Sequence, residues 1–352
     1  MHEAVYYQKL DKKRIRCQLC SHRCLILPGK RGICSVRENR NGTLYTLVYG
    51  LVIAANVDPI EKKPFFHFLP GSKSFSIATA GCNFRCKFCQ NWEISQLPKN
   101  RGEGLGFVPH ASTEPDLNDS YTTPDEIVKQ ALFTNCQSIA YTYTEPTIFF
   151  EYAIDTAKLA KKAGLTNVFV SNGYQTPETI KQMAGLIDAV NIDLKSFSDE
   201  FYQQVCGARL QPVLDSIKLM HNLGIWVEIT TLLVPGQNDS PDELSKLAKF
   251  IASVDKNIPW HISRFHPDYQ LTDMQPTPLK TLESAYAIGK GVGLNYIYIG
   301  NVIDDKHEST YCPKCNNLAI KRVGYDINII GINNKDTCQK CGYKFNLKLS
   351  VL

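Results

Sequence analysis

The sequence lacks the features that mark a membrane or exported protein. Its longest nearly uncharged apolar run, residues 44–57, is shorter than the about 20 residues that a transmembrane helix needs. Residues 1–13 are polar, with no apolar stretch before a small-residue cleavage site, so no signal peptide is expected. Internal repeats and low-complexity tracts are also lacking, which argues against solenoid and fibrous folds. We therefore expect a cytoplasmic protein that does not enter a membrane.

The composition is that of an ordinary globular protein, with 43% hydrophobic and 21% charged residues. The length of 352 residues suits one large α/β core with small additions. The net charge of +5 is uneven, because residues 1–40 carry ten Lys/Arg against three Asp/Glu and the remaining residues carry 29 against 31. This basic arm suits nucleic acid, an anionic substrate or an acidic partner, although solvated surface is the simpler interpretation.

From residue 74 onward, short β-rich runs alternate with helical stretches, which is typical of repeated βα units around a parallel sheet. The predicted strands are 74–79, 138–143, 167–171, 189–193, 226–233, 260–264 and 296–299. Three helices announce their starts with a hydroxyl residue, a proline and acidic residues, at 123–126, 176–178 and 240–243. We predict an α/β fold that closes partly or fully into a (β/α) barrel, with active-site groups at the carboxyl ends of its strands.

Three parts are expected along the chain. A basic, cysteine-rich N-terminal module occupies 1–70, the core barrel 71–305, and a C-terminal module resembling a zinc ribbon 306–352. The polar stretch 97–122 has no clear period, so we predict a loop or lid there, with a disordered surface insertion as the alternative.

Thirteen cysteines are present, and eleven of them fall into three compact groups. In a reducing compartment such groups favour metal or cluster ligation over disulfides. The groups are Cys17, Cys20, Cys24 and Cys34; Cys82, Cys86 and Cys89; and Cys312, Cys315, Cys338 and Cys341. Cys136 and Cys206 stand apart, and we interpret them as buried or incidental thiols.

The central group has the spacing CxxxCxxC at the point where a predicted strand ends. Its three thiolates can hold three irons of a 4Fe–4S cluster, while the fourth iron keeps an open position for a small molecule. With Phe88 directly before Cys89, the motif resembles the signature of the radical S-adenosylmethionine (SAM) superfamily. The resemblance implies that the chain is an enzyme in which the cluster reductively cleaves SAM to a 5′-deoxyadenosyl radical. This radical would abstract hydrogen from a substrate that the sequence does not identify.

The resemblance continues at the ends of the following predicted strands and implies SAM-binding roles there. Phe88, Thr144, Glu145, Ser171, Asn172, Asp193, Lys195 and His266 are the residues concerned. Thr144 and Glu145 occupy the position of a Gly-Gly-Glu stretch that binds the SAM amino group, although the glycines are absent. A surface lysine at 195 and a structural histidine at 266 are the alternatives. Thr230 replaces an arginine of some glycyl-radical-enzyme activases, a departure that weakens any claim to the same substrate.

The order of segments along nearly the whole chain resembles the radical SAM member of the AmmeMemoRadiSam system, whose core is similar to pyruvate formate-lyase activating enzymes. The segments are 17–34, 58–64, 81–92 and the terminal CxxC pairs. This resemblance implies AMMECR-like and Memo-like partner proteins. A flavodoxin- or ferredoxin-like donor would supply low-potential electrons.

The flanking cysteine groups predict further metal sites. The pairs 312/315 and 338/341 have the spacing of a zinc ribbon, which implies a closed, structural site. The N-terminal group suits zinc, an auxiliary iron–sulfur cluster or free thiols, with His22 as an alternative ligand.

Three other functions compete with the general radical SAM interpretation. One is a glycyl-radical-enzyme activase that acts on a partner protein. Another is a zinc-ribbon nucleic-acid-binding protein, which leaves the central motif unexplained and makes a nucleic-acid partner a weak expectation. A multi-cluster electron-transfer protein would need four ligands at every cluster, and the central group has three.

Overall fold

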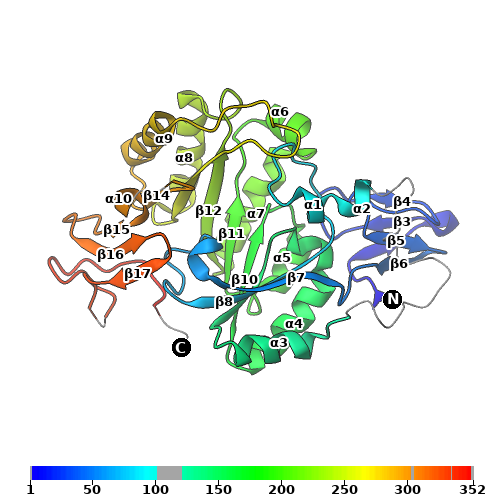
Figure 1. The fold of residues 1–352 in the computed structure, drawn as a ribbon. Coiled ribbons are helices and arrows are strands. Elements are labelled where there is room, and N and C mark those ends of the chain that lie inside the picture. The colour runs from blue at the N-terminus through cyan, green and yellow to red at the C-terminus, as the bar shows by residue number, and fades with distance from the viewer. Residues whose placement is uncertain (1, 101–120, 303–304, 334, 350–352) are drawn as a thin grey trace.

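The computed structural model describes residues 2–100, 121–302, 305–333 and 335–349 (Figure 1). Its centre is one eight-stranded sheet in the order β14-β13-β12-β11-β10-β9-β8-β7, in which β7 alone is antiparallel to its neighbour. The strands are β7 (Val52–Pro59), β8 (Lys73–Thr79), β9 (Ser138–Tyr141), β10 (Thr166–Ser171), β11 (Ala189–Asp193), β12 (Trp226–Leu233), β13 (Trp260–Arg264) and β14 (Ile297–Gly300). The sheet is curved but open, so the partial-barrel form of the predicted fold is confirmed.

Helices cover the outer face of this sheet, and α4, α7 and α9 contact the strands that they connect (Figure 1). The helices are α1 (Trp92–Ser95), α2 (Leu97–Asn100), α3 (Pro124–Phe133), α4 (Phe150–Lys162), α5 (Pro177–Met183), α6 (Asp199–Phe201), α7 (Leu210–Asn222), α8 (Pro241–Asp255), α9 (Leu279–Val292) and α10 (Asp305–Glu308). The inner strands are almost wholly buried, as expected where helices face a parallel sheet. Within the described ranges, no helix has the length and apolar character required to cross a membrane.

The predicted helix starts are confirmed in atomic detail. Thr123, Thr176 and Ser240 each accept a hydrogen bond from the backbone N–H three residues later, and a proline follows each of them. These contacts satisfy backbone donors that the first turn of a helix leaves without partners. The stretch predicted at 97–122 begins with α2, while residues 101–120 lie outside the described residues.

The N-terminal region forms two small three-stranded sheets beside the large one (Figure 1). Their strands are β1 (His2–Glu3), β5 (Arg37–Arg40) and β6 (Thr43–Thr46), and β2 (Tyr7–Lys9), β3 (Ile15–Cys17) and β4 (Leu25–Ile26). A tight turn at Asn41-Gly42 joins β5 to β6, with both residues at positive φ. Strand β7 belongs to the large sheet although it precedes residue 70, so the boundary predicted there falls within the β7–β8 connection.

A buried ion pair fastens the N-terminal region to the core. Arg37 places Nη2 2.7 Å from Oε1 of Glu151 on α4, and both side chains are almost fully buried. The backbone N–H of Val5 donates to the same carboxylate. Backbone pairing between Cys20 and Gln175 adds a second contact, in the loop after β10. The first cysteine group is therefore held against the carboxyl ends of the barrel strands.

The C-terminal region, which carries β15 (Thr310–Tyr311), β16 (Leu318–Val323) and β17 (Asp326–Ile329), lies on the opposite side of the molecule (Figure 1). Buried Arg322 donates from Nη2 to the backbone oxygen of Phe66 at 2.6 Å. Glu228 of β12 accepts the backbone N–H groups of Phe66, His67 and Phe68. The segment 66–68 thus links the C-terminal sheet to the barrel.

Candidate functional site

A cavity of about 1210 Å³ opens at the carboxyl ends of the large sheet. All three cysteines of the central group line it, as do side chains that follow β9, β10, β11 and β14. This placement agrees with the prediction that active-site groups gather at that end of the strands. Residues from five separate segments of the sequence therefore line one cavity.

The cysteine loop leaves β8 through Gly81, where φ is +110° and an added Cβ would lie 2.9 Å from Val36 Cγ1. Within the loop, the Phe84 N–H donates to Cys82 Sγ at 3.3 Å, and Cys89 Sγ lies 3.2 Å from Ser95 Oγ. Burial raises the pKa of the Cys82 thiol, so a thiolate there needs a nearby positive charge. Iron ions would supply that charge, and three thiols around one cavity fit a 4Fe–4S cluster.

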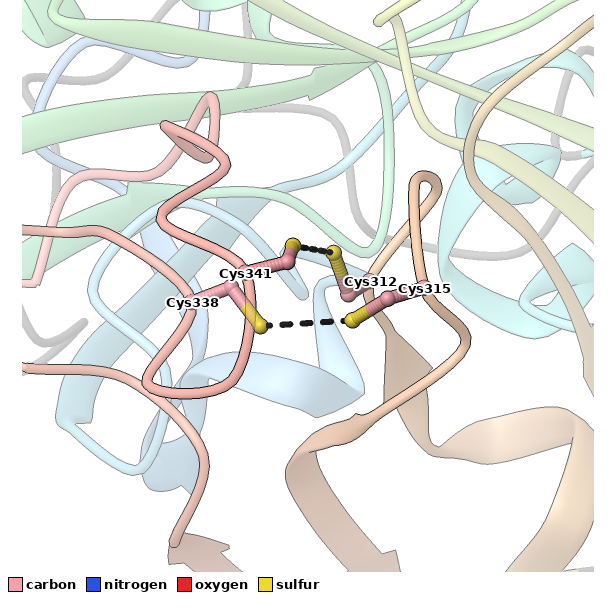
Figure 2. A group of neighbouring side chains, drawn as sticks. All are labelled: Cys312, Cys315, Cys338 and Cys341. Carbon is pink, nitrogen blue, oxygen red and sulfur yellow. Dashed lines mark hydrogen bonds between the residues drawn. The ribbon is translucent and has the colours of Figure 1, made fainter.

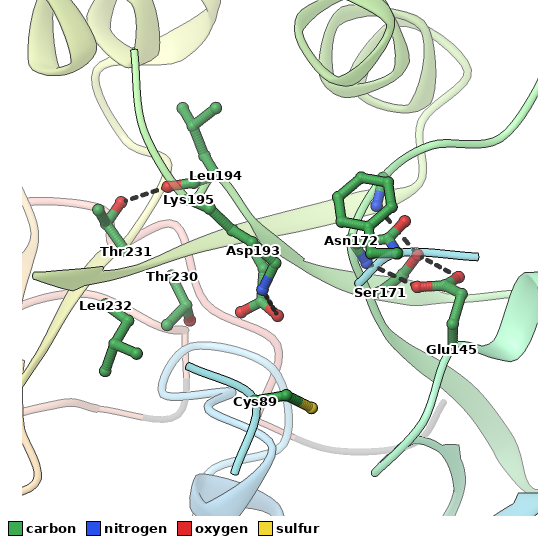
Figure 3. Close-up of polar contacts among 12 residues, drawn as sticks. Cys89, Glu145, Ser171, Asn172, Asp193, Leu194, Lys195, Thr230, Thr231 and Leu232 are labelled. Carbon is green, nitrogen blue, oxygen red and sulfur yellow. Dashed lines mark hydrogen bonds and ion pairs between the residues drawn. The ribbon is translucent and has the colours of Figure 1, made fainter. Parts of the chain in front are cut away.

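A buried carboxylate joins two strand ends beside this loop (Figure 3). Oε1 of Glu145 accepts from Ser171 Oγ at 2.8 Å, and Oε2 accepts the Asn172 N–H at 2.8 Å. Burial raises the pKa of Glu145, while the hydrogen bonds from Asn172 and Thr147 oppose that shift. Thr144 donates to the backbone oxygen of Thr79 and thereby holds the ends of β8 and β9 together. All these predicted residues lie at the cavity.

An ion pair between Lys195 Nζ and Asp193 Oδ2, 3.0 Å long, follows β11 (Figure 3). The ammonium also lies 5.5 Å from the ring of Phe88, which in turn stacks on Phe201. Burial opposes the charge on Lys195, but Asp193 and the nearby thiol of Cys86 outweigh it and raise its pKa. Lys195 is therefore a half-buried lysine that lines the cavity and pairs with Asp193. This environment differs from that of a solvated surface lysine.

His266 occupies a different environment from the other predicted residues. It is exposed on the loop after β13, and its Nε2 lies 3.0 Å from Nε2 of Gln90, a residue that lines the cavity. Thr230, the departure from the activases, lines the cavity and donates from Oγ1 to Asn191 Oδ1 at 2.8 Å. Its hydroxyl is thus engaged within the sheet.

Sequence reasoning gave no site role to a second polar group on the cavity wall. Lys63 Nζ lies 2.6 Å from Asp58 Oδ2, and Tyr143, held at a φ of 60°, donates its hydroxyl to the same carboxylate. Burial lowers the pKa of Lys63 to about 8, while Asp58 opposes the shift. Although burial opposes it, hydrogen bonds from Lys62, Lys63 and Tyr143 hold the pKa of Asp58 well below its usual range. Adjacent lysines that follow Asp58 and Glu61 and precede an apolar run were the available signal.

The four C-terminal cysteines form a compact group (Figure 2). Their sulfurs all lie within 4.8 Å of one another, and those of Cys312 and Cys341 are 3.5 Å apart. Such a group could hold a metal ion. The N-terminal cysteines instead line a second, smaller cavity together with His22 and Asn83.

Comparison with known proteins places this geometry in context. A sequence profile of the radical SAM superfamily matches residues 76–251. An uncharacterised protein of Methanocaldococcus jannaschii is 45% identical over 99% of this chain and 100% of its own length. The pyruvate formate-lyase 1-activating enzyme of Escherichia coli is 25% identical over 59% of this chain and 85% of its own. Among solved structures, a domain of a pyruvate formate-lyase-activating enzyme from Bacteroides vulgatus has a TM-score of 0.41 at 22% identity, covering 47% of this chain and 99% of that domain.

Proposed function

The chain belongs to the radical SAM superfamily and is similar to pyruvate formate-lyase activating enzymes, and we propose that it cleaves SAM reductively. Membership of the family implies a 4Fe–4S cluster and SAM, and the residues that would hold the cluster are Cys82, Cys86 and Cys89. When bound, the two cofactors supply one-electron cleavage of SAM to a 5′-deoxyadenosyl radical, which takes hydrogen from a substrate. The observation that carries the proposal is that these three thiols and the predicted SAM residues other than His266 line one cavity.

Several side chains are suited to orient SAM. Glu145 Oε2 accepts one backbone hydrogen bond, which leaves a lone pair for an amino group. Lys195 can pair with the methionine carboxylate in place of Asp193, and Asp193 can then accept ribose hydroxyls. Asn172 donates from Nδ2 to Asn83 Oδ1 at 2.7 Å, which ties the ribose side of the proposed site to the cysteine loop. His266 would act from outside, through its contact with Gln90.

The substrate would bind at the wall formed by Lys63 and Tyr143, whose shared partner is Asp58. The cavity, at about 1210 Å³, exceeds the about 300–1,000 Å³ of typical small-molecule pockets, so it has room for SAM and a second molecule. Lys63, with a pKa lowered to about 8, can donate or accept a proton near neutral pH. This wall would thus control protonation of the substrate next to the site of hydrogen abstraction.

A glycyl radical on a partner enzyme is the second candidate product. It is supported by relatives described as activating enzymes, among them the one from Escherichia coli and a putative one from Methanocaldococcus jannaschii. In that case a glycine loop of the partner would enter the cavity. The two candidates differ in whether hydrogen is lost from a small molecule or from a protein.

The wider setting is also part of the proposal. We place the protein in the cytoplasm, where a flavodoxin- or ferredoxin-like donor would reduce it, with AMMECR-like and Memo-like proteins as partners. The C-terminal cysteines would hold zinc in a structural, zinc-ribbon-like site. A nucleic-acid partner is not part of the proposal, because the central cavity accounts for the chemistry-bearing residues without one.

The decisive experiment is anaerobic reconstitution with iron and sulfide, followed by dithionite and SAM. Wild type and Cys136→Ala, which removes a buried thiol outside the three groups, should both form 5′-deoxyadenosine. Cys86→Ala should form none above background. If a fully loaded wild-type cluster yields no deoxyadenosine, the proposal is wrong.

A further inference from the structure

Four cysteines line the second, smaller cavity, which lies outside the proposed SAM site. Cys17 and Cys34 are buried, and Cys20 and Cys24 are half-buried. All four are free thiols, brought together from β3, the β3–β4 connection and the turn before β5. Asn83 of the cysteine loop completes one wall. Four soft ligands around one enclosed space are a metal-binding arrangement.

The distances between the sulfurs distinguish a site for a single metal ion from a site for an iron–sulfur cluster. Thiolates that share one tetrahedral zinc, at Zn–S distances of about 2.3 Å, stand about 3.8 Å apart. The C-terminal sulfurs meet this condition, since all of them lie within 4.8 Å of one another. Among the residues that the structure describes, no three N-terminal ligand atoms do so. Cys82, Cys86 and Cys89, the proposed ligands of the central cluster, likewise form no such close group, which is consistent with thiolates that bind different irons.

Two buried donors point to the same conclusion. Arg37 Nε and Asn83 Nδ2 are buried, have no hydrogen-bond partner, and belong to residues that line this cavity. Their side chains are well ordered through other atoms, because Arg37 bonds Glu151 and Asn83 Oδ1 accepts from Asn172. A buried N–H without an acceptor destabilises the folded protein. Sulfides and thiolates of a cluster are acceptors for such groups.

His22 adjoins the four thiols. Its Nε2 lies 2.9 Å from the backbone oxygen of Asn83 and so donates to that carbonyl. The other ring nitrogen keeps its lone pair, so the cavity offers one imidazole nitrogen beside the four thiols.

We propose that this cavity binds a second 4Fe–4S cluster, held by Cys17, Cys20, Cys24 and Cys34, with the free N–H groups of Arg37 and Asn83 bonded to its sulfurs. Four thiolates occupy every iron, so this cluster has no position for SAM or substrate. Its chemistry is electron transfer. The proposal is independent of whether the central site cleaves SAM.

The position of the cavity suits a relay to the central site. Asn83 directly follows Cys82, and a Cβ added to Gly81 would lie 3.5 Å from the backbone oxygen of Cys34. In each transfer, one electron passes from a low-potential one-electron carrier protein to the second cluster. The same electron then passes to the cluster at Cys82, Cys86 and Cys89, so the second cluster returns to its oxidised state. No proton or atom moves in this step.

The test uses the full chain with the central site removed. In a Cys82→Ala, Cys86→Ala, Cys89→Ala variant, reconstituted anaerobically, we expect about four irons and four sulfides per chain. Dithionite should then produce the electron paramagnetic resonance signal of a reduced cluster. Adding Cys20→Ala and Cys34→Ala should abolish both iron and signal. Adding Cys136→Ala instead, as the matched control, should change neither.

Three outcomes would overturn the proposal. Zinc in the N-terminal site of the triple variant would show a single-ion site, and a folded triple variant without iron would show that no cluster binds. Should the triple variant not fold, wild type decides the question, with about eight irons per chain in support and about four against. None of these measurements requires SAM, so a failed cleavage assay leaves this result unaffected.

Discussion

The C-terminal cysteines and the cysteines of the barrel cavity share the CxxC element but differ in geometry. The C-terminal sulfurs approach one another to 3.5 and 3.6 Å, on loops outside the strands of the C-terminal sheet (Figure 2). Cys82, Cys86 and Cys89 are spread around a cavity of about 1210 Å³. A closed tetrahedron contributes to folding, whereas an open arrangement leaves room for reaction. Under the proposed function, stability and chemistry would therefore belong to different cysteine groups of this chain.

The largest expected effect comes from removing one cysteine from each of these two groups. In iron-free protein, Cys338→Ala should lose bound zinc and the stability that it provides, since structural zinc binds with apparent free energies of about 10–16 kcal/mol in small zinc peptides. Cys89→Ala should keep the zinc and unfold within a few degrees of wild type. Zinc analysis and thermal unfolding measure both results.

After iron loading, SAM cleavage should be impaired in the other variant, Cys89→Ala. Cys89→Ala should form no deoxyadenosine, while Cys338→Ala should retain SAM cleavage per cluster at low temperature. Abolished cleavage in a folded, iron-loaded Cys338→Ala protein would break the comparison, because the C-terminal group would then take part in the chemistry.

The next largest effect, on the free energy of unfolding, concerns the buried ion pair that fastens the N-terminal region to the core. Glu151→Gln removes the buried charge that pairs with Arg37, and we expect it to lower the free energy of unfolding by about 3–5 kcal/mol. Asp242→Asn breaks the exposed pair with Lys246 and should change stability by less than about 1 kcal/mol. Urea unfolding compares the two. Equal effects would mean that the buried pair does not fasten the N-terminal sheets.

A pH effect of about 3 kcal/mol is expected where the C-terminal region meets the barrel. His67 bonds the backbone oxygen of Asn346 at 2.7 Å and the Tyr298 hydroxyl at 2.6 Å, and burial lowers its pKa to about 4. The unfolded chain binds a proton at about pH 6.5, so the unfolded state holds more protons between pH 6.5 and 4. Stability is therefore present above pH 6.5 and lost as the pH falls toward 4.

The measurement is the slope of the unfolding free energy against pH in wild type and His67→Asn. The variant should lose up to one proton of linkage in this window, while acid release of zinc affects both proteins alike. Identical slopes would show that His67 is not held neutral in the folded protein.

The smallest effect tests the reactive side of the comparison alone. Lys195→Met should weaken SAM binding by roughly 10- to 100-fold, because it removes a charge-assisted bond worth about 1.5–3 kcal/mol. Zinc content and thermal unfolding should stay near those of wild type. Lys87→Met, at an exposed lysine of the cysteine loop after β8, is the control. If both variants bind SAM as wild type does, Lys195 has no part in the site.

Much of the barrel could be predicted because its signals are local. The strand over 189–193 is bounded as predicted, and so are those over 226–233 and 260–264, since buried β-rich runs and N-cap chemistry depend on neighbouring residues. The first predicted strand is longer by one residue, and the second ends at Tyr141 rather than Tyr143, where the chain turns to a positive φ. Such boundaries depend on the site that follows the strand.

Long-range pairing accounts for what sequence reasoning missed. Strand β7 joins the large sheet only because the chain folds back antiparallel to β8, and no periodicity encodes that choice. The Asp58–Lys63 pair and Tyr143 meet across 85 residues of sequence. The wide spacing of the N-terminal sulfurs likewise appears only in three dimensions, since zinc and cluster sites share the same cysteine intervals.

The open sheet has a mechanical consequence for substrate entry. A closed barrel resists widening because its ring of hydrogen bonds is continuous, but here β7 and β14 end the sheet on either side. Its aperture can therefore flex without breaking a strand ladder. The Arg322–Phe66 and Glu228–Phe66 hydrogen bonds would limit this flexing. Phe66 also lines the cavity, so these hydrogen bonds fix part of the cavity wall.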